Sequence, residues 1–134
     1  MKYLLFFTIF LLSSPSYAHD GQEKSLCPDS KTSIEISKCV DALFNSAEEE
    51  RLEKEEAELQ HAEILEKDFK DMNSVQYQDF TSYVQKSRAA FETYREEECM
   101  RIRLSYGAGT MAGIGYISCK LNLTEQRIES LRNE

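Results

Sequence analysis

Two helices and the turn between them are encoded in the stretch CMRIRLSYGAGTMAGIGYISC, Cys99–Cys119. Apolar residues at helical spacing flank it on both sides, and glycines gather between them. Gly107 is expected to end the first helix, because glycine most easily adopts the left-handed conformation found there. Cys99 lies about two turns before the glycines and Cys119 about one turn after them. An antiparallel hairpin brings these cysteines together, so the stretch predicts a Cys99–Cys119 disulfide.

The same stretch contains a dinucleotide-binding pattern, G-x-G-x-x-A, from Gly107 to Ala112. That loop must follow a strand and open a helix within a βαβ unit, whereas this one follows a helical pattern. We therefore interpret the glycines as the turn of a disulfide-closed hairpin, which would also make a rigid recognition loop. The candidate partner-binding residues are Tyr106, Gly107, Gly109, Thr110, Met111, Ile114 and Tyr116.

The remaining cysteines, Cys27 and Cys39, predict a second disulfide. A continuous helix would separate them by roughly 18 Å, so we expect a turn at Pro28-Asp29-Ser30. The alternative is a four-thiolate zinc site. Such sites usually contain close C-x-x-C pairs, and the four cysteines of this chain lack that spacing.

The amino terminus predicts an exported protein. Lys2, a short apolar run and a small-residue site ending at Ala18 are typical of a cleaved secretory signal over residues 1–18. An uncleaved membrane anchor is the alternative. We expect a flexible lead-in over residues 19–26 and one domain over residues 27–134, located in the bacterial periplasm or secreted, with no membrane insertion after cleavage.

Acidic residues dominate the chain after the signal. Removal of Lys2 leaves 15 basic against 24 acidic residues, a net charge of −9. This charge disfavours nucleic acids and anionic membranes and favours a basic protein partner. Residues 48–71 alone hold eleven acids and four bases. They form either a solvated helix face or a binding surface for the basic partner.

Apolar residues recur at helical spacing in three segments. The first starts at Ile36, the second is a helix that Asn73-Ser74 can cap and that carries Phe80, and the third follows the glycines and includes Ile117. No segment alternates convincingly as a strand. The sequence predicts an all-α fold: a small antiparallel bundle of three to four helices stapled by two disulfides.

Catalytic and metal-binding patterns are weak. His61 stands alone on the acidic segment, and nothing in the sequence places it near His19 to form a copper site. The acidic residues lie in a solvated run rather than in an apolar pocket. We therefore expect neither an enzyme, nor a cofactor, nor a metal site.

Three motifs resemble the LprI-type family of small exported bacterial proteins, which is named for a lysozyme inhibitor. The first motif is CPDSKTSIEISKC, with Thr32 and Glu35 between its cysteines. The second is FETYREEEC, with Tyr94, Arg95 and Cys99 in register and with Phe91 and Glu96 in place of the family's Trp and Asp. The third is the closing series Cys119, Thr124, Arg127 and Leu131. The middle segment AEEERLEKEE lacks the Asn and Tyr that are usual in the family.

The resemblance implies a protein that blocks a basic lysozyme by non-covalent contacts. The alternative is a non-inhibitory periplasmic protein, an interaction partner or accessory factor of the cell envelope. We expect structural roles for Tyr94, Arg95 and Arg127. Tyr94 would pack against the glycine loop, and Arg95 would bind loop carbonyls or a carboxylate. The oligomeric state is not predicted.

Overall fold

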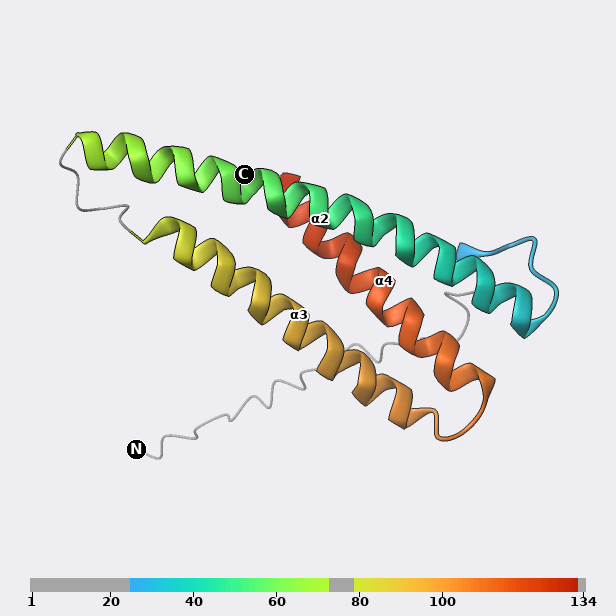
Figure 1. Cartoon of the computed structure of the whole chain (residues 1–134). Coiled ribbons are helices and arrows are strands. Elements are labelled where there is room, and N and C mark those ends of the chain that lie inside the picture. Colours follow the sequence, from blue (N-terminus) through green and yellow to red (C-terminus); the bar gives the residue numbers. More distant parts are fainter. Residues whose placement is uncertain (1–24, 73–78, 133–134) are drawn as a thin grey trace, which may run out of the picture.

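The computed structural model describes residues 25–72 and 79–132. They form three long helices, α2 (Ser33–Asp71), α3 (Phe80–Ser105) and α4 (Thr110–Arg132). α3 runs antiparallel to α2, and α4 turns back along α3 and packs against both (Figure 1). The predicted all-α bundle with two disulfides is confirmed.

The start of α2 is fixed by a turn and a capping box. The Ser30 amide donates to the Cys27 carbonyl at 3.1 Å, within the predicted turn. Thr32 then caps the helix: its Oγ1 accepts from the Glu35 amide, and the Glu35 carboxylate accepts from the Thr32 amide. The turn brings the Cα atoms of Cys27 and Cys39 to 6.2 Å, and the predicted disulfide between them is confirmed.

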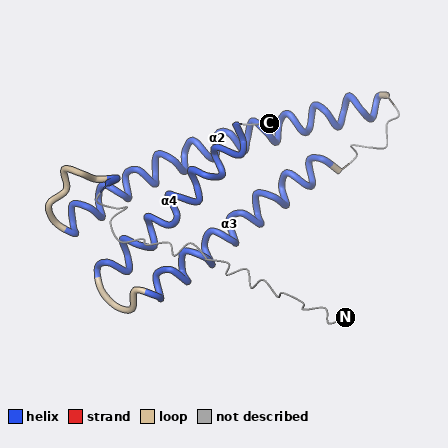
Figure 2. The backbone as a smooth tube through the Cα atoms, turned by 180° about the vertical axis from the view of Figure 1, so that it is seen from behind, coloured by secondary structure: helices blue, strands red, loops and turns tan. Residues whose placement is uncertain are grey.

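The apolar core lies at the end of the bundle that carries both disulfides. Val40 of α2 and Leu121 of α4 are fully or almost fully buried and contact Cys27. Half-buried Phe44 and Ile117 pack around them. Seen from behind, the turn before α2 and the α3–α4 loop occupy this same end (Figure 2). The disulfides therefore join chain segments near this apolar cluster.

The middle of the bundle is held by buried ion pairs. Glu55 of α2 is 1 % exposed, and its carboxylate contacts a cation from every helix. Arg51 of α2 binds it from one turn away. Arg88 of α3 and Arg127 of α4 place their Nε atoms 3.2 and 3.1 Å from its oxygens. The glutamate therefore ties all three helices together.

A second carboxylate, Glu48, extends this network. Arg95 of α3 is buried and donates to Glu48 and, at 2.7 Å, to Oγ1 of the fully buried Thr124 of α4. Arg51 also donates to Glu48, at 2.7 Å. Burial alone would raise the pKa of Glu48, but the hydrogen bonds from Arg95 and Arg51 lower it to about 2. Glu48 is therefore a stable anion at neutral pH.

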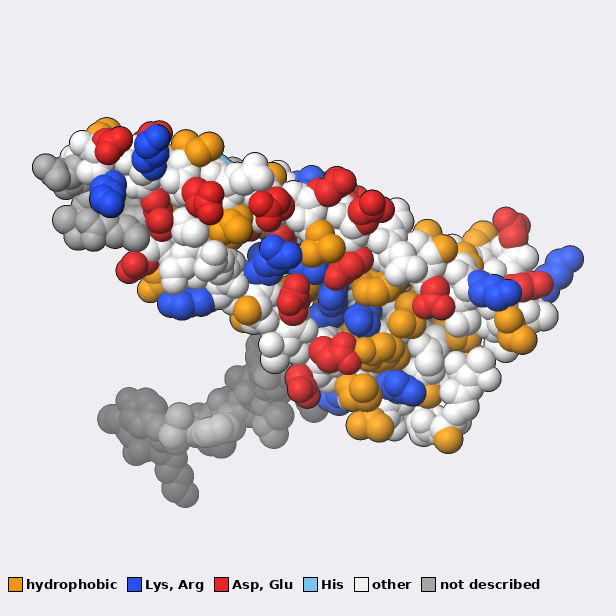
Figure 3. Space-filling view, in the orientation of Figure 1, with side chains coloured by type: hydrophobic (Ala, Val, Ile, Leu, Met, Phe, Trp, Pro, Cys, Tyr) orange, Lys and Arg blue, Asp and Glu red, His pale blue; other side chains and the backbone are white. Residues whose placement is uncertain are grey.

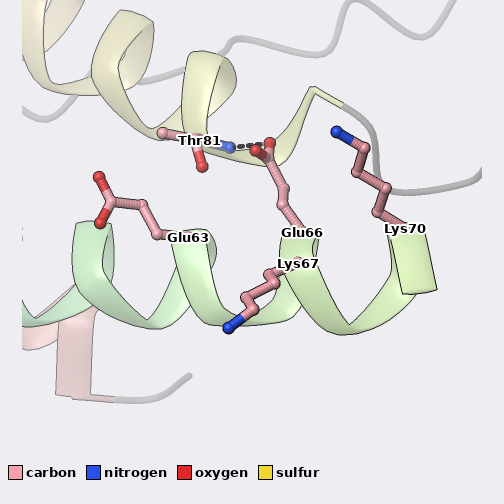
Figure 4. A pocket seen from close by; sticks show the side chains of 5 residues that line it. All are labelled: Glu63, Glu66, Lys67, Lys70 and Thr81. Carbon is pink, nitrogen blue, oxygen red and sulfur yellow. Dashed lines mark hydrogen bonds between the residues drawn. The ribbon is translucent and has the colours of Figure 1, made fainter.

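α2 and α3 continue past the end of α4 as a two-helix arm (Figure 1). Here Glu66 of α2 reaches across and accepts a hydrogen bond from the Thr81 amide at 2.6 Å (Figure 4). That amide belongs to the first turn of α3, where backbone N–H groups have no partner within the helix. A side chain of α2 thus caps α3 and fixes the two helices of the arm to each other.

The predicted signal peptide, residues 1–18, lies outside the described residues, as does most of the lead-in, residues 19–26. In the part of the chain that the structure describes, no helix has the length and apolar character needed to cross a membrane.

Arg95→Ala should lower the free energy of unfolding by about 1.5–3 kcal/mol, because it removes the donor that the half-buried Glu48 carboxylate and the buried Thr124 hydroxyl share. Arg101→Ala is the matched control: it removes an arginine of the same helix whose side chain is 65 % exposed and pairs with Glu98. Its effect should be much smaller, because solvent screens an exposed ion pair. Urea unfolding followed by circular dichroism measures both. Equal effects would contradict the assignment of Arg95 to the core.

Glu48→Gln should change the pH dependence of stability. The lowered pKa means that the stabilisation from the Glu48 anion is complete above its ordinary pKa of 4.5 and is lost as the pH falls toward about 2. The difference in unfolding free energy between wild type and Glu48→Gln should therefore be largest above pH 5 and shrink toward zero near pH 2. Urea titrations across this range provide the measurement, and a constant difference would contradict the prediction.

Candidate functional site

Two glycines make the turn between α3 and α4. The amides of Tyr106 and Gly107 donate to the carbonyls of Arg103 and Leu104 and close the last turn of α3. Gly107 then takes a φ of 72° and Gly109 a φ of 128°, conformations that residues with a Cβ rarely adopt. The predicted end of the helix at Gly107 is confirmed. The chain thus reverses within Tyr106–Gly109.

Two contacts support the turn from behind. The Cys99–Cys119 disulfide joins α3 and α4 with a Cα–Cα distance of 5.5 Å, and both cysteines are buried. Closer to the turn, the ring of Tyr106 lies directly against the backbone of Gly115 in α4: a Cβ placed on Gly115 would stand 2.7 Å from Cε2 of the ring. Any side chain at this position would displace the tyrosine. The ring therefore occupies a space that is available only because residue 115 has no side chain.

A hydrogen bond between Tyr116 and Glu96 adds a polar contact between α4 and α3. The phenol donates to Glu96 at 2.6 Å. Burial and this hydrogen bond raise the pKa of Tyr116 to about 12, and the same bond lowers the pKa of Glu96. Lys120 also lies 3.5 Å from Glu96. Tyr116 therefore remains protonated at physiological pH and acts as a structural donor.

The turn and its flanks form an uncharged surface in a highly charged protein. Residues 104–119 contain no Lys, Arg, Asp or Glu, although such residues make up 30 % of the chain. Leu104 is 71 % exposed and Met111 45 % exposed, with exposed Gly107, Ala108, Gly109 and Thr110 between them. We call Leu104–Met111 the tip. In Figure 3 the lower right corner of the molecule, where the α3–α4 hairpin turns, is mostly white and orange, whereas red and blue side chains line α2 above it.

The structure corrects the predicted recognition loop in two respects. α4 begins at Thr110, so Met111, Ile114 and Tyr116 belong to a helix rather than to a loop. Ile114 is 1 % exposed and packs inside the bundle, so it cannot contact a partner in this conformation. Tyr116 is half-buried. Tyr106, whose ring lies against Gly115, is half-buried as well, so the exposed candidate contact residues are Gly107, Gly109, Thr110 and Met111.

The three residues expected to be structural occupy different positions. Arg95 binds a carboxylate, one of the two options considered, and Arg127 pairs with Glu55. The expectation that Tyr94 packs against the glycine loop is wrong. It is 56 % exposed and lines a small groove of about 210 Å³ between α3 and α4, beside Ile102. The ring that packs at the loop is Tyr106, because its position faces Gly115.

The acidic segment of α2 has both a buried and an exposed side. Glu55 is buried and Glu48 is half-buried within the ion network. The exposed side carries Glu49, Glu53, Glu56 and Glu63. Neither a solvated face nor a binding surface alone describes the segment, because part of its charge stabilises the bundle. Arg51 lies three and four residues from its carboxylate partners, but the exposed pair of Arg101 and Glu98 has the same kind of spacing, so the sequence did not single out the buried acids.

Three tip residues, Leu104, Ser105 and Ala108, were not among the predicted contact residues, although the absence of charge over residues 104–119 indicated them. His61 is exposed on α2, and His19 lies outside the described residues, so the copper hypothesis stays untested. Among the described residues, no three His, Cys, Asp or Glu side chains come close enough to hold a metal ion.

The tip offers apolar contacts and backbone groups, which are suited to binding another protein surface.

Comparison with known proteins identifies the family. A family model described as "Lysozyme inhibitor LprI" matches residues 27–131, from the first cysteine to the end of α4. The chain therefore belongs to the LprI family, as its motifs suggested. No curated protein and no solved structure matches it.

Gly115→Ala and Gly113→Ala should change stability in opposite directions. Both replace a glycine inside α4, which by itself stabilises a helix by about 0.5–1 kcal/mol. A Cβ at Gly113 meets no described atom within 4 Å, whereas one at Gly115 collides with the Tyr106 ring. Gly113→Ala should raise the melting temperature and Gly115→Ala should lower it. Equal increases in thermal unfolding experiments would show that the ring is not seated there.

Proposed function

We propose that this LprI family member is an exported binding protein that blocks a basic lysozyme, with the tip as its contact surface. The proposal rests on the family match together with the form of the tip. A glycine turn held by a disulfide and a seated tyrosine is rigid before binding. Little conformational entropy is then lost when a partner is contacted.

The lack of charge on the tip fits the chemistry of a glycosidase cleft. Such enzymes place two carboxyl groups on either side of the bond they cleave. An acidic loop would be repelled there, whereas Leu104 and Met111 can bury apolar area without bringing a carboxylate into the cleft. A bound tip would exclude the glycan substrate by occupying its place, and no chemical step is needed.

The exposed acidic residues of α2 would act at longer range. Glu49, Glu53 and Glu56 lie on the exposed side of the helix, and the chain after the signal carries a net charge of −9. A basic enzyme is drawn toward such a surface, which raises the association rate and makes it fall with ionic strength. In this proposal the acidic face of α2 attracts the basic enzyme, and the tip makes the direct contact with it.

We place this activity in the periplasm or outside the cell. Disulfides form and persist in oxidising compartments, and all four cysteines are paired in two disulfides. A lysozyme acts on the cell wall, which lies outside the cytoplasmic membrane, as the proposed location does.

Lysis of a cell-wall suspension by a basic lysozyme, followed by turbidity, tests the proposal. The exported, oxidised protein should inhibit lysis in a dose-dependent way. Exchanging both exposed apolar residues of the tip, Leu104→Ser with Met111→Ser, should raise the half-inhibitory concentration by about tenfold or more. Leu52→Ser is the matched control, because it removes an exposed leucine from α2, outside the tip. Its inhibition should equal that of the wild type.

A second variant separates attraction from contact. Replacing Glu49, Glu53 and Glu56 by glutamine should slow association and flatten its salt dependence while leaving full inhibition at high concentration. Surface plasmon resonance at low and moderate salt gives both rates. Undiminished lysis with excess wild-type protein would overturn the inhibitor function. Inhibition that survives the double tip exchange would place the contact elsewhere.

A further inference from the structure

The arm carries a groove that none of the three described helices covers. It begins where α4 ends and has a volume of about 660 Å³. Its apolar lining comes from all three helices: Ala57 and Leu65 of α2, Phe80 of α3 and Leu131 of α4. In the body of the protein α4 fills the corresponding space between α2 and α3 (Figure 1). Beyond Leu131 the two long helices continue without that cover.

The apolar surface extends from this groove along α2. Ile64 follows Ala57 by seven residues and Met72 follows Leu65 by seven, so each lies on the same side of the helix as its predecessor. Ile64 is 59 % exposed and Met72 is 65 % exposed. Scattered apolar residues on a surface are ordinary, but a run joined to an apolar groove marks an interaction site.

The face of α2 that borders the groove is complementary to itself. Its residues are Ala57, His61, Ile64, Leu65, Asp68 and Met72. If this face meets a second copy in antiparallel orientation, with the two-fold axis between residues 64 and 65, Ala57 lies opposite the partner's Met72. His61 then lies opposite the partner's Asp68. The small Ala57 side chain thus faces the long side chain of the partner's Met72, and the imidazole of His61 faces the carboxylate of the partner's Asp68.

We propose that two copies of this chain associate through this face of their arms, with a two-fold axis near Ile64. The two-fold symmetry repeats each of these pairs, so one contact between His61 and the partner's Asp68 implies a second. Ile64 and Leu65 lie at the centre, where desolvated residues contribute most to binding. The arm is a dimerisation element.

The charges at the groove favour a second copy over a strongly basic protein. Lys54 and His61 stand beside Glu58 along the groove, and Asp68 follows on the same helix. In the proposed register the complementary pair is His61 and the partner's Asp68, whereas a strongly basic partner would be repelled by Lys54. The arm also lies at the end of the molecule opposite the tip (Figure 1). The dimer therefore leaves both tips accessible.

Sedimentation velocity of the exported, oxidised protein from micromolar to millimolar concentration tests the proposal. We expect a monomer–dimer equilibrium. Ile64→Glu should raise the dimer dissociation constant by about tenfold or more, because a charge enters the centre of an apolar contact. Leu52→Glu, which adds the same charge to α2 outside the arm, should leave it unchanged. A monomer at every concentration overturns the proposal, and so does a dimer that tolerates Ile64→Glu.

A charge exchange tests the register itself. His61→Asp should weaken the dimer, because each new carboxylate faces the partner's Asp68. The double variant His61→Asp with Asp68→Lys should restore it, since the introduced carboxylate of one copy then faces the introduced ammonium of the other, twice over. His61→Asp with Glu56→Lys has the same net charge, but position 56 lies off the face, and the dimer should stay weak. Equal rescue by both lysines overturns the proposed register, and so does rescue by neither. Far-ultraviolet circular dichroism of each variant excludes unfolding as the cause.

Discussion

The carboxylate of Glu55 is the point on which the arrangement of the three helices depends. It is almost fully buried, and it contacts Arg51 in its own helix, Arg88 in α3 and Arg127 in α4. A buried anion is costly unless cations and hydrogen bonds compensate it. Sliding or rotating any of the helices would remove one of these cations. The network thus disfavours other registers more strongly than an apolar contact would, because apolar contacts are not directional.

The charged centre divides the molecule into regions with different tasks. On one side lie the disulfides and the apolar cluster around Val40 and Leu121, which hold the base of the α3–α4 hairpin. On the other side lies the arm, where Glu66 and Thr81 join two helices that lack a third. A chain of this size has a modest core. Covalent links at one end and ion pairs in the middle supply the order that apolar burial alone does not.

Helix type, chain reversal at the glycines and both disulfide pairings could be predicted, because each rests on local pattern or on the reach of the chain. The ion network could not. Glu48 and Glu55 resemble their exposed neighbours in the sequence, and Arg95 lies 47 residues from Glu48. Only the packing of α3 and α4 decides which acids of α2 turn inward. The same reason explains the error at Ile114: four glycines suggested a long loop, but helix α4 begins at Thr110 and buries that side chain.

In the complex proposed above, the uncharged tip and the acidic remainder of the chain have separate roles. In an acidic protein, long-range attraction to a basic partner needs no help from the contact surface, since the potential of the whole molecule supplies it. Contact, in contrast, requires groups whose desolvation costs little free energy. Leu104, Met111 and a glycine backbone meet that need better than carboxylates do. Keeping carboxylates out of residues 104–119 also keeps the turn free of ion pairs that would have to break on binding. Charged and contact residues can occupy different surfaces because electrostatic attraction acts over a long distance, whereas apolar contact acts only at short range.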